Sequence, residues 1–444
     1  MGKKLGFGLL GLLVAGAIYY FTIGSSILAS EMQKQVNSEL LQASTHGFKV
    51  EEHNVKQMKE HFTLTLDNPE KITHFLETRG ILVQKSDIET LTGLKLGVDI
   101  AYLSDAYSAV SIDLYPLTLP TQLTAVNLEP KDKKILTQFT TMLTNKALLV
   151  HVDVNKLGTG FKGYIQDINE TINDDFMTNV SLQGLTFEGS VNAHKLEKIT
   201  QNLKALHLLL DEKVSISLQG MQSHYLLTGK TKYDYSSSYS IDTIQVQDNN
   251  HSSLSLQDTQ ISSISVVQDN LMTASIISNT KSIHIKDKEK TFTLDTLKLN
   301  TKTSNLDILA FEKLQEVDAQ NQEALNTVMQ QLVSKGVRID IQNISAQNIS
   351  YEDKKLDDFN LTAYLDIDKS LNITALQQNP LLAISAIDAN LKLTLAPALF
   401  KFISEQPKAM LMLMLFQPQD INGKKVYSAE LKDGKLTVNG MPVM

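Results

Sequence analysis

Most of the chain alternates between apolar and polar residues with a period of two. Phe62–Leu66, Val98–Tyr102 and Val110–Leu114 each place their apolar side chains on one face and their polar ones on the other. This pattern predicts strands of antiparallel sheets that pack on one face, because successive side chains of a strand point to opposite sides. Further strands are predicted at Leu148–Leu157, Val214–Leu218, Leu254–Leu256, Ile261–Val267, Ile283–Ile285, Phe292–Leu299, Ile339–Ile341, Leu361–Ile367 and Leu391–Leu395.

A smaller number of segments repeat their apolar residues at helical spacing. We expect a helix at residues 31–43, one that begins at Asn68-Pro69 and ends near Gly80, and a long one from about Asp307 to Ser334. Others are predicted after Pro130, along the stripe Ile199, Leu203, Leu206 and Leu210, and in the apolar segment Ala398–Phe416. The predicted fold class is α+β and mainly β, with an N-terminal transmembrane helix and extended antiparallel sheet on which several helices pack on one face.

An uncharged apolar segment follows Lys3 and Lys4. As a helix, Leu5–Ile23 would span about 28 Å, close to the roughly 30 Å of a bilayer's hydrocarbon core. Its distal end is aromatic, as is typical of a membrane interface, and the two lysines place the N-terminus in the cytoplasm. The anchor residues expected in the membrane include Leu5, Leu9, Leu12, Leu13, Val14, Ile18, Tyr19, Tyr20, Phe21 and Ile23.

The alternative for this segment is a cleaved signal peptide, and both interpretations export the rest of the chain. We therefore predict a cytoplasmic tip at residues 1–4, a transmembrane anchor at 5–29 and a helical stalk at 30–46. A β-rich periplasmic region follows at 47–305, and a helix with a C-terminal β region occupies 306–444 on the same sheet system.

Composition narrows the classes of function. The chain has 444 residues, enough for more than one packing unit, and it contains no cysteine, which removes disulfides, thiolate nucleophiles and zinc–thiolate sites. Its net charge is −8, and only Arg79 and Arg338 are arginines among its 41 basic residues. Because arginine is the residue that clamps phosphate bidentately, we expect no nucleic-acid partner.

The clearest local signal is a β-hairpin near the C-terminus. Val426–Leu431 and Leu436–Val438 flank Asp433-Gly434, which suits the positive φ angles of a tight turn, and Asn439-Gly440 marks a second turn. The whole segment, Asn422–Val443, resembles the C-terminal hairpin of the YdgA-like family of bacterial envelope proteins, a domain of unknown function. Ala319–Asn348, which is rich in glutamine and alanine, is similar to the family's helix before a strand. The family's early Arg-Gly pair is missing from His53–Leu66.

This resemblance implies one N-terminal span, an inner-membrane anchor and a periplasmic body. It implies no catalytic residues, since the family has none established. The histidines, namely His46, His53, His61, His74, His151, His194, His207, His224, His251 and His284, form no zinc motif, and we expect His151 and His284 on solvent-facing sides of strands. Nucleophile-elbow and phosphate-loop motifs are absent from the sequence as well. We expect no catalytic, metal or cofactor site.

One apolar segment has two interpretations. Residues 410–416 read MLMLMLF, and adaptable methionine side chains suit a surface that accommodates apolar ligands. A lipid-facing role would fall to Met410, Met412, Met414 and Phe416, whereas the alternative is a fully buried core helix.

Three functions are compatible with these patterns. The leading hypothesis is a non-catalytic binding or scaffold protein of a Gram-negative envelope, anchored in the inner membrane, with a lipid or another envelope protein as its partner. The second is a lipid-handling protein with an apolar groove on a curved sheet. The third is a hydrolase whose His, Ser and carboxylate groups converge only in the fold. The sequence does not predict the oligomeric state.

Overall fold

The computed structural model describes residues 29–78, 83, 85–103, 107–121, 140–172, 178–192, 195–210, 213–317, 321–378, 384–406 and 417–443. The chain divides into two compact units, and the division falls between Leu226 and Leu227. The predicted anchor at 5–23 and the methionine-rich segment at 410–416 lie outside the described residues. Among the helices within the described ranges, none combines the length and apolarity that a membrane crossing requires.

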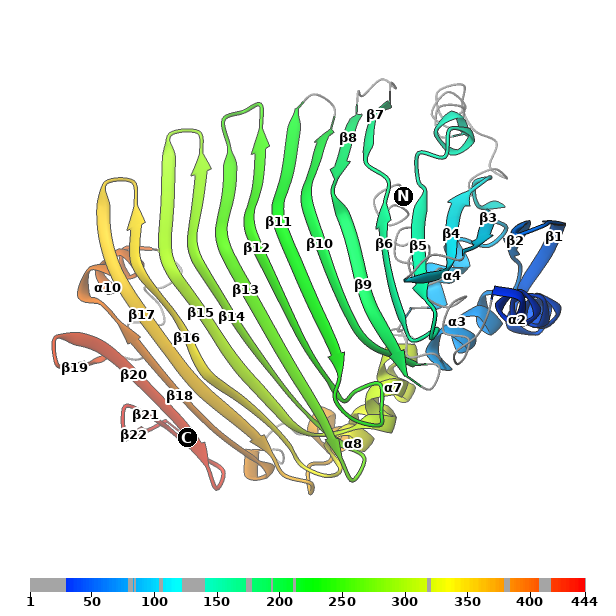
Figure 1. The fold of residues 1–444 in the computed structure, drawn as a ribbon. Coiled ribbons are helices and arrows are strands. Elements are labelled where there is room, and N and C mark those ends of the chain that lie inside the picture. Colours follow the sequence, from blue (N-terminus) through cyan, green and yellow to red (C-terminus); the bar gives the residue numbers. More distant parts are fainter. Residues whose placement is uncertain are drawn as a thin grey trace. The chain divides into compact units, whose positions relative to one another are not determined.

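The sheet of unit 1 is an antiparallel meander (Figure 1). From β1 to β6 each strand pairs with the next one along the chain. The chain then forms one long hairpin in which each arm is broken into two strands. The first arm is β6 and β7 and the second is β8 and β9, so that β6 pairs with β9 and β7 with β8, and the second arm also pairs with β10. The strands are β1 (Phe48–Lys56), β2 (Lys59–Leu66), β3 (Lys95–Tyr102), β4 (Ser108–Pro116), β5 (Val150–Asn155), β6 (Gly160–Ile165), β7 (Ile168–Ile172), β8 (Thr178–Gln183), β9 (Leu185–Asn192), β10 (Lys195–Leu210) and β11 (Val214–Leu227).

One face of this sheet carries the core of unit 1. The described helices of unit 1 are α2 (Ala29–Gln42), η1 (Ala43–His46), α3 (Pro69–Thr78) and α4 (Lys85–Thr90). Asn68 caps α3, with its side-chain oxygen accepting a hydrogen bond from the Lys71 amide at 3.0 Å. The predicted stalk helix is present, and Val36 and Leu40 bury its apolar side in the same core as Phe62 and Phe75. This helix therefore belongs to unit 1 through its packing.

Unit 2 is a second meander, made of longer strands. Each strand pairs with its successor from β12 to β18, and β18 then pairs with β20. The strands are β12 (Tyr235–Asp248), β13 (Ser253–Gln268), β14 (Leu271–Asp287), β15 (Lys290–Asp307), β16 (Val337–Tyr351), β17 (Lys354–Ile367), β18 (Ile387–Leu395), β19 (Gln419–Ile421), β20 (Lys424–Lys432), β21 (Lys435–Val438) and β22 (Met441–Pro442). The described helices of unit 2 are α7 (Ile308–Glu316), α8 (Gln322–Val333), α9 (Ile373–Gln378), η3 (Ile384–Ala386) and α10 (Pro397–Ser404).

The long strands of unit 2 bend part-way along their length (Figure 1). Non-glycine residues with positive φ interrupt several of them, among them Asp258 in β13 (49°), Thr296 in β15 (52°) and Asp357 in β17 (68°). The register also shifts around Asp295 and around Ile349. Bulges of this kind insert a residue and bend the strand, so the bend is a feature of several neighbouring strands rather than of one.

The predicted strands are all present, but two helix predictions are wrong. The stripe Ile199–Leu210 belongs to strand β10, which pairs with β8 and β9 on one side and β11 on the other. The helix expected from Asp307 to Ser334 is two helices, because Val317 is extended and the Asn321 side chain caps a new start by accepting from the Ala324 amide. The helix predicted after Pro130 lies mainly outside the described residues.

Candidate functional site

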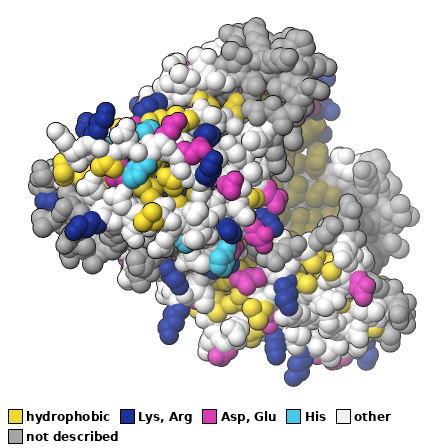
Figure 2. All heavy atoms as spheres, turned by 90° about the vertical axis from the view of Figure 1, so that its right-hand side faces the viewer, with side chains coloured by type: hydrophobic (Ala, Val, Ile, Leu, Met, Phe, Trp, Pro, Cys, Tyr) yellow, Lys and Arg dark blue, Asp and Glu magenta, His cyan; other side chains and the backbone are white. Residues whose placement is uncertain are grey.

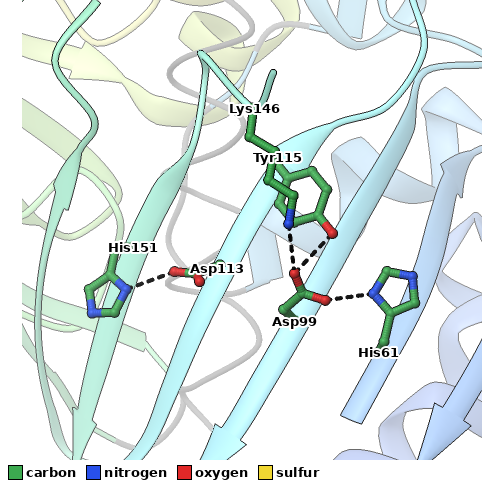
Figure 3. A network of polar contacts seen from close by, with 6 residues as sticks. All are labelled: His61, Asp99, Asp113, Tyr115, Lys146 and His151. Carbon is green, nitrogen blue, oxygen red and sulfur yellow. Dashed lines mark hydrogen bonds and ion pairs between the residues drawn. The ribbon is translucent and has the colours of Figure 1, made fainter. Parts of the chain in front are cut away.

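A row of polar side chains crosses the face of unit 1 opposite its core. Cross-strand pairing places His61 opposite Asp99, Asp99 opposite Asp113, and Asp113 opposite His151. The carboxylates of Asp99 and Asp113 lie directly opposite each other and would repel. In this row each of them is paired with a histidine of a flanking strand, Asp99 with His61 of β2 and Asp113 with His151 of β5 (Figure 3).

Asp99 is the most heavily bonded member of the row. Its carboxylate contacts His61 Nδ1 at 2.6 Å, accepts from the Tyr115 hydroxyl at 2.9 Å and pairs with Lys146 Nζ at 3.0 Å. Burial alone would raise the pKa of Asp99, but the hydrogen bonds from His61, Lys146 and Tyr115 outweigh it and hold this pKa below its ordinary value. The Lys146 ammonium also lies 3.7 Å from the centre of the Tyr115 ring.

His151 is the second member of the row with several contacts. Its Nδ1 lies 2.8 Å from the Asp113 carboxylate, and its ring stacks on Tyr164 with centroids 4.8 Å apart. The hydrogen bond to Asp113 raises the pKa of His151, and burial opposes this in part. As predicted, His151 lies on the side of its strand that faces away from the core, but its side chain is only 21% exposed and is paired with Asp113. His284, predicted in the same way, is exposed.

Ser111 completes an arrangement with the connectivity of a Ser–His–Asp relay. Its hydroxyl lies 3.5 Å from His151 Nε2, while Asp113 holds Nδ1. However, Asp153 also lies 3.5 Å from that Nε2, so the serine competes with a carboxylate for it. A general base must be unprotonated before it can accept a proton, whereas the raised pKa of His151 favours its protonated form. Ser111 also sits within β4, which is paired with β3 and β5, so its strand amides face neighbouring strands rather than an oxyanion.

One side of unit 1 can be followed in Figure 2, and it shows no strong charge of one sign. On the side seen in Figure 2, acidic, lysine and histidine side chains are intermixed. Within the described part of the chain, no group of three or more metal-ligating side chains has the geometry to hold a metal ion. The polar row is therefore a set of mutually satisfied pairs that joins four strands.

The sheet of unit 2 carries a second candidate site, an apolar strip three rows wide across β13–β18. Cross-strand pairing gives one of these rows as Ser263, Ile276, Thr301, Ile341, Ala363 and Leu391. The complete strip consists of Ile261, Ser263, Ser265, Ala274, Ile276, Ser278, Leu299, Thr301, Thr303, Ile339, Ile341, Ile344, Leu361, Ala363, Leu365, Ala389, Leu391 and Leu393. No charged residue belongs to it.

Much of the strip faces outward. Ile276 is 43% exposed, Leu391 38% and Ile339 37%, and all other members except Ser265 are half-buried. With strands about 4.8 Å apart and about 6.8 Å between rows, the strip covers on the order of 300 Å². A contiguous apolar area of that size on a soluble domain is often a functional surface.

Helices border the strip along its two long sides, beyond the outer rows. On one side Met272 of β14 packs with Ile308 of α7, and on the other Leu395 of β18 packs with Leu399 of α10. The opposite face of the same strands carries charges, for example Arg338, which pairs with Asp340 at 2.8 Å and Asp366 at 3.1 Å. The sheet of unit 2 therefore has one polar and one apolar face over β15–β18.

The sequence-predicted residues fall differently on these sites. The lipid-facing candidates Met410, Met412, Met414 and Phe416 and the ten anchor residues lie outside the described residues. A strand segment was predicted in each of the six strands of the strip, but that of β14, Ile283–Ile285, does not reach the strip. The lateral assembly of the strands into one apolar face was not predicted. The polar row was missed, and the only local signal for it is an acidic residue or histidine in the polar half of an alternating strand.

A family model described as "Bacterial protein of unknown function (DUF945)" matches residues 118–444. The chain belongs to this family. The resemblance to YdgA-like proteins is thereby confirmed. The match to DUF945 includes the whole apolar strip and His151, whereas His61, Asp99 and Asp113 precede it. No curated protein matches the chain, and no solved structure does.

Proposed function

We propose that this DUF945 protein is a non-catalytic, membrane-anchored component of the bacterial envelope that holds the acyl chains of a lipid on the apolar strip of unit 2. The observation that carries the proposal is the strip itself, an uncharged, partly exposed face whose reverse side is charged over β15–β18. A sheet with one wet and one apolar face must cover the apolar one, and a lipid is the partner that matches an elongated, uncharged surface.

The dimensions of the strip support an acyl chain. Five spacings between β13 and β18 amount to about 24 Å, whereas one leaflet of a bilayer core is about 15 Å thick. Covering the area of the strip, on the order of 300 Å², contributes at most about 8 kcal/mol before the entropy of binding is subtracted, because some members of the strip are serine or threonine. That is sufficient to hold a lipid reversibly.

The hydrolase hypothesis has one observation in its favour, the Ser111–His151–Asp113 connectivity. The raised pKa of His151 and the competing Asp153 argue against an active base at neutral pH. We therefore assign these residues a structural role within unit 1.

The anchor is part of the proposal. Leu5–Ile23 would fix the chain in the inner membrane and place both units in the periplasm, within reach of membrane lipid. A reporter enzyme fused after Met444 tests this: activity that requires export is expected, and activity only in the cytoplasm would contradict the placement.

Two adjacent isoleucines of β14 give a matched test of lipid binding. Ile276 lies on the strip and is 43% exposed, while Ile277 points to the other face and is 42% exposed. Ile276→Glu places a charge where the ligand would cover it, so we expect native mass spectrometry of the purified full chain to show loss of co-purifying lipid. Ile277→Glu should retain it.

Two results would contradict the proposal. One is wild-type protein that carries no lipid and takes none up from vesicles of phosphatidylethanolamine and phosphatidylglycerol. The other is equal retention by both variants. Circular dichroism of both variants checks that each keeps its β structure.

A further inference from the structure

The apolar strip continues past β18 onto the C-terminal hairpin. Cross-strand pairing places Ala429 of β20 opposite Leu391, and Val438 of β21 opposite Ala429. Residues that lie directly opposite each other in a sheet point to the same face. A second row runs beside this one, and Met441 and Val443 end the two rows at the edge of the sheet. We call the members of these two rows beyond β18 the edge extension: Ala429, Leu431, Leu436, Val438, Met441 and Val443.

The edge extension is apolar like the strip and reaches further into solvent. None of its members carries a charge or a hydroxyl group. Met441 is 64% exposed and Val443 48%, compared with 43% for Ile276, the most exposed member of the strip. The reverse face of the same hairpin is charged, because Glu430 and Lys435 point there. The contrast between one apolar and one charged face therefore continues to the edge of the sheet.

The strip and the edge extension together are longer than one acyl chain. Because β18 pairs directly with β20, eight spacings separate β13 from β22. At about 4.8 Å each they amount to about 38 Å. One acyl chain in a membrane spans about 15 Å, the thickness of one leaflet of the bilayer core. A single chain laid across the strands would thus leave more than half of this length in contact with water.

Building on the proposed function, we infer that the apolar face of unit 2 holds at least two acyl chains end to end, one over β13–β17 and one over β18–β22. Two chains of about 15 Å take up about 30 Å of the roughly 38 Å that the face offers. The second chain covers the edge extension, where the apolar side chains are most exposed. The reason is the one that applies to the strip, namely that an amphipathic sheet must cover its apolar face.

Two neighbouring residues of β21 give a matched test of the second chain. Val438→Glu places a charge within the edge extension, whereas Thr437→Glu places one on the reverse face of the same strand. A variant that combines Ile276→Glu with Val438→Glu measures the lipid that is held elsewhere on the full chain, around the proposed anchor in particular. Acyl chains per protein are counted as fatty acid methyl esters after extraction of each variant purified in the same detergent.

Wild-type protein should carry about two or more acyl chains above the level of the combined variant. Val438→Glu should carry about one fewer than the wild type, and Thr437→Glu as many as the wild type. Met441→Glu changes a side chain that is 64% exposed, so it should leave the hairpin folded and should lower the count as Val438→Glu does. Circular dichroism compares the β structure of the variants.

The contrary results separate this inference from the proposed function. Equal counts for the wild type and the combined variant would overturn both. Wild-type counts in Val438→Glu and Met441→Glu, or an equal fall in Thr437→Glu, would overturn the second chain alone. A fall of Val438→Glu to the level of the combined variant would mean that one ligand spans the whole face. That result would overturn the end-to-end arrangement and leave lipid binding intact.

Discussion

Both units are antiparallel meanders, but they differ in what covers the apolar face of the sheet. In unit 1 helices cover one face of the meander and produce a large buried core that includes Phe62, Val110 and Val150, each 0% exposed. In unit 2 the buried clusters are small and sit near the ends of the strands, and the middle of the apolar face is left partly exposed. Alternation along a strand therefore predicts an apolar face but not what covers it. In unit 1 the cover is protein, and in unit 2 we propose that it is lipid.

The largest expected effect is a difference between the two units in the stability that is lost when an isoleucine of the sheet is replaced by alanine. Ile112 of β4 is 2% exposed and Ile276 of β14 is 43% exposed. Ile112→Ala leaves a cavity and should destabilise unit 1 by about 2–5 kcal/mol, whereas Ile276→Ala should cost less than about 1 kcal/mol. Hydrogen exchange of amides in each unit, followed in denaturant, measures the two separately. Similar losses in both units would mean that the strip is ordinary core.

A second pair of variants tests how tightly unit 1 is packed. A Cβ on Gly163 of β6 would lie 2.2 Å from the His151 carbonyl oxygen and 2.6 Å from the Phe187 ring, whereas one on Gly160 meets chiefly the end of the Asn155 side chain. Backbone does not move aside easily, so Gly163→Ala should destabilise unit 1 by about 1–3 kcal/mol. Gly160→Ala should cost less. A thermal shift of equal size for both variants would contradict the close approach seen at Gly163.

The polar row makes the stability of unit 1 depend on pH. The hydrogen bond to Asp113 raises the pKa of His151 above its ordinary 6.5, so its stabilisation is complete below that value and is lost as pH rises through the folded pKa. The pKa of Asp99 is lowered, so its contribution is present above 3.8 and is lost as pH falls through the folded pKa. Unit 1 should therefore be most stable in weak acid, between these two transitions.

Nuclear magnetic resonance of the His151 ring checks the upper transition. Asp113→Asn should lower the pKa of His151, because it removes the negative charge while keeping a side chain of similar size. Asp388→Asn in unit 2 serves as the control and should leave the titration of His151 unchanged. A His151 pKa at or below the ordinary value in the wild type would refute the pairing.

The sequence predicted strand segments where local alternation is regular, but it made no strand prediction for β1, β6–β9 or β12. For β10 it predicted a helix, because irregularities disturb the alternation there. The core-facing residues of β10 are Leu196, Ile199, Leu203 and Leu206, spaced by three, four and three. The register shifts between Leu196 and Lys198, and a second irregularity faces Gly184 and Gly220, both in the left-handed region. One bulge and this second irregularity thus turned a period of two into the spacing of a helix. No residue pattern within one segment reports such a defect.

The candidate sites were hidden from sequence for a different reason. Asp99 and His151 are more than 50 residues apart, and their strands become neighbours of β4 only through the meander. The strip likewise draws three residues from each of six strands. Sequence alternation identified only part of the members, and only pairing in register aligned them into rows. The members outside the predicted strands are Ala274, Ile276, Ser278, Thr301, Thr303, Ile344 and Ala389.

The smallest expected effect concerns the bend of unit 2. Thr296 of β15 has a φ of 52°, a strained value for a β-branched residue. Asparagine tolerates this conformation better, so Thr296→Asn should raise the stability of unit 2 by about 1 kcal/mol. Thr291→Asn, on the same strand but without a positive φ, should be neutral or destabilising because asparagine is a poor strand former. Chemical unfolding of both variants decides the matter. A loss of stability in both variants would mean that position 296 has regular strand geometry. The bend of β15 would then have to come from something other than a bulge at this position.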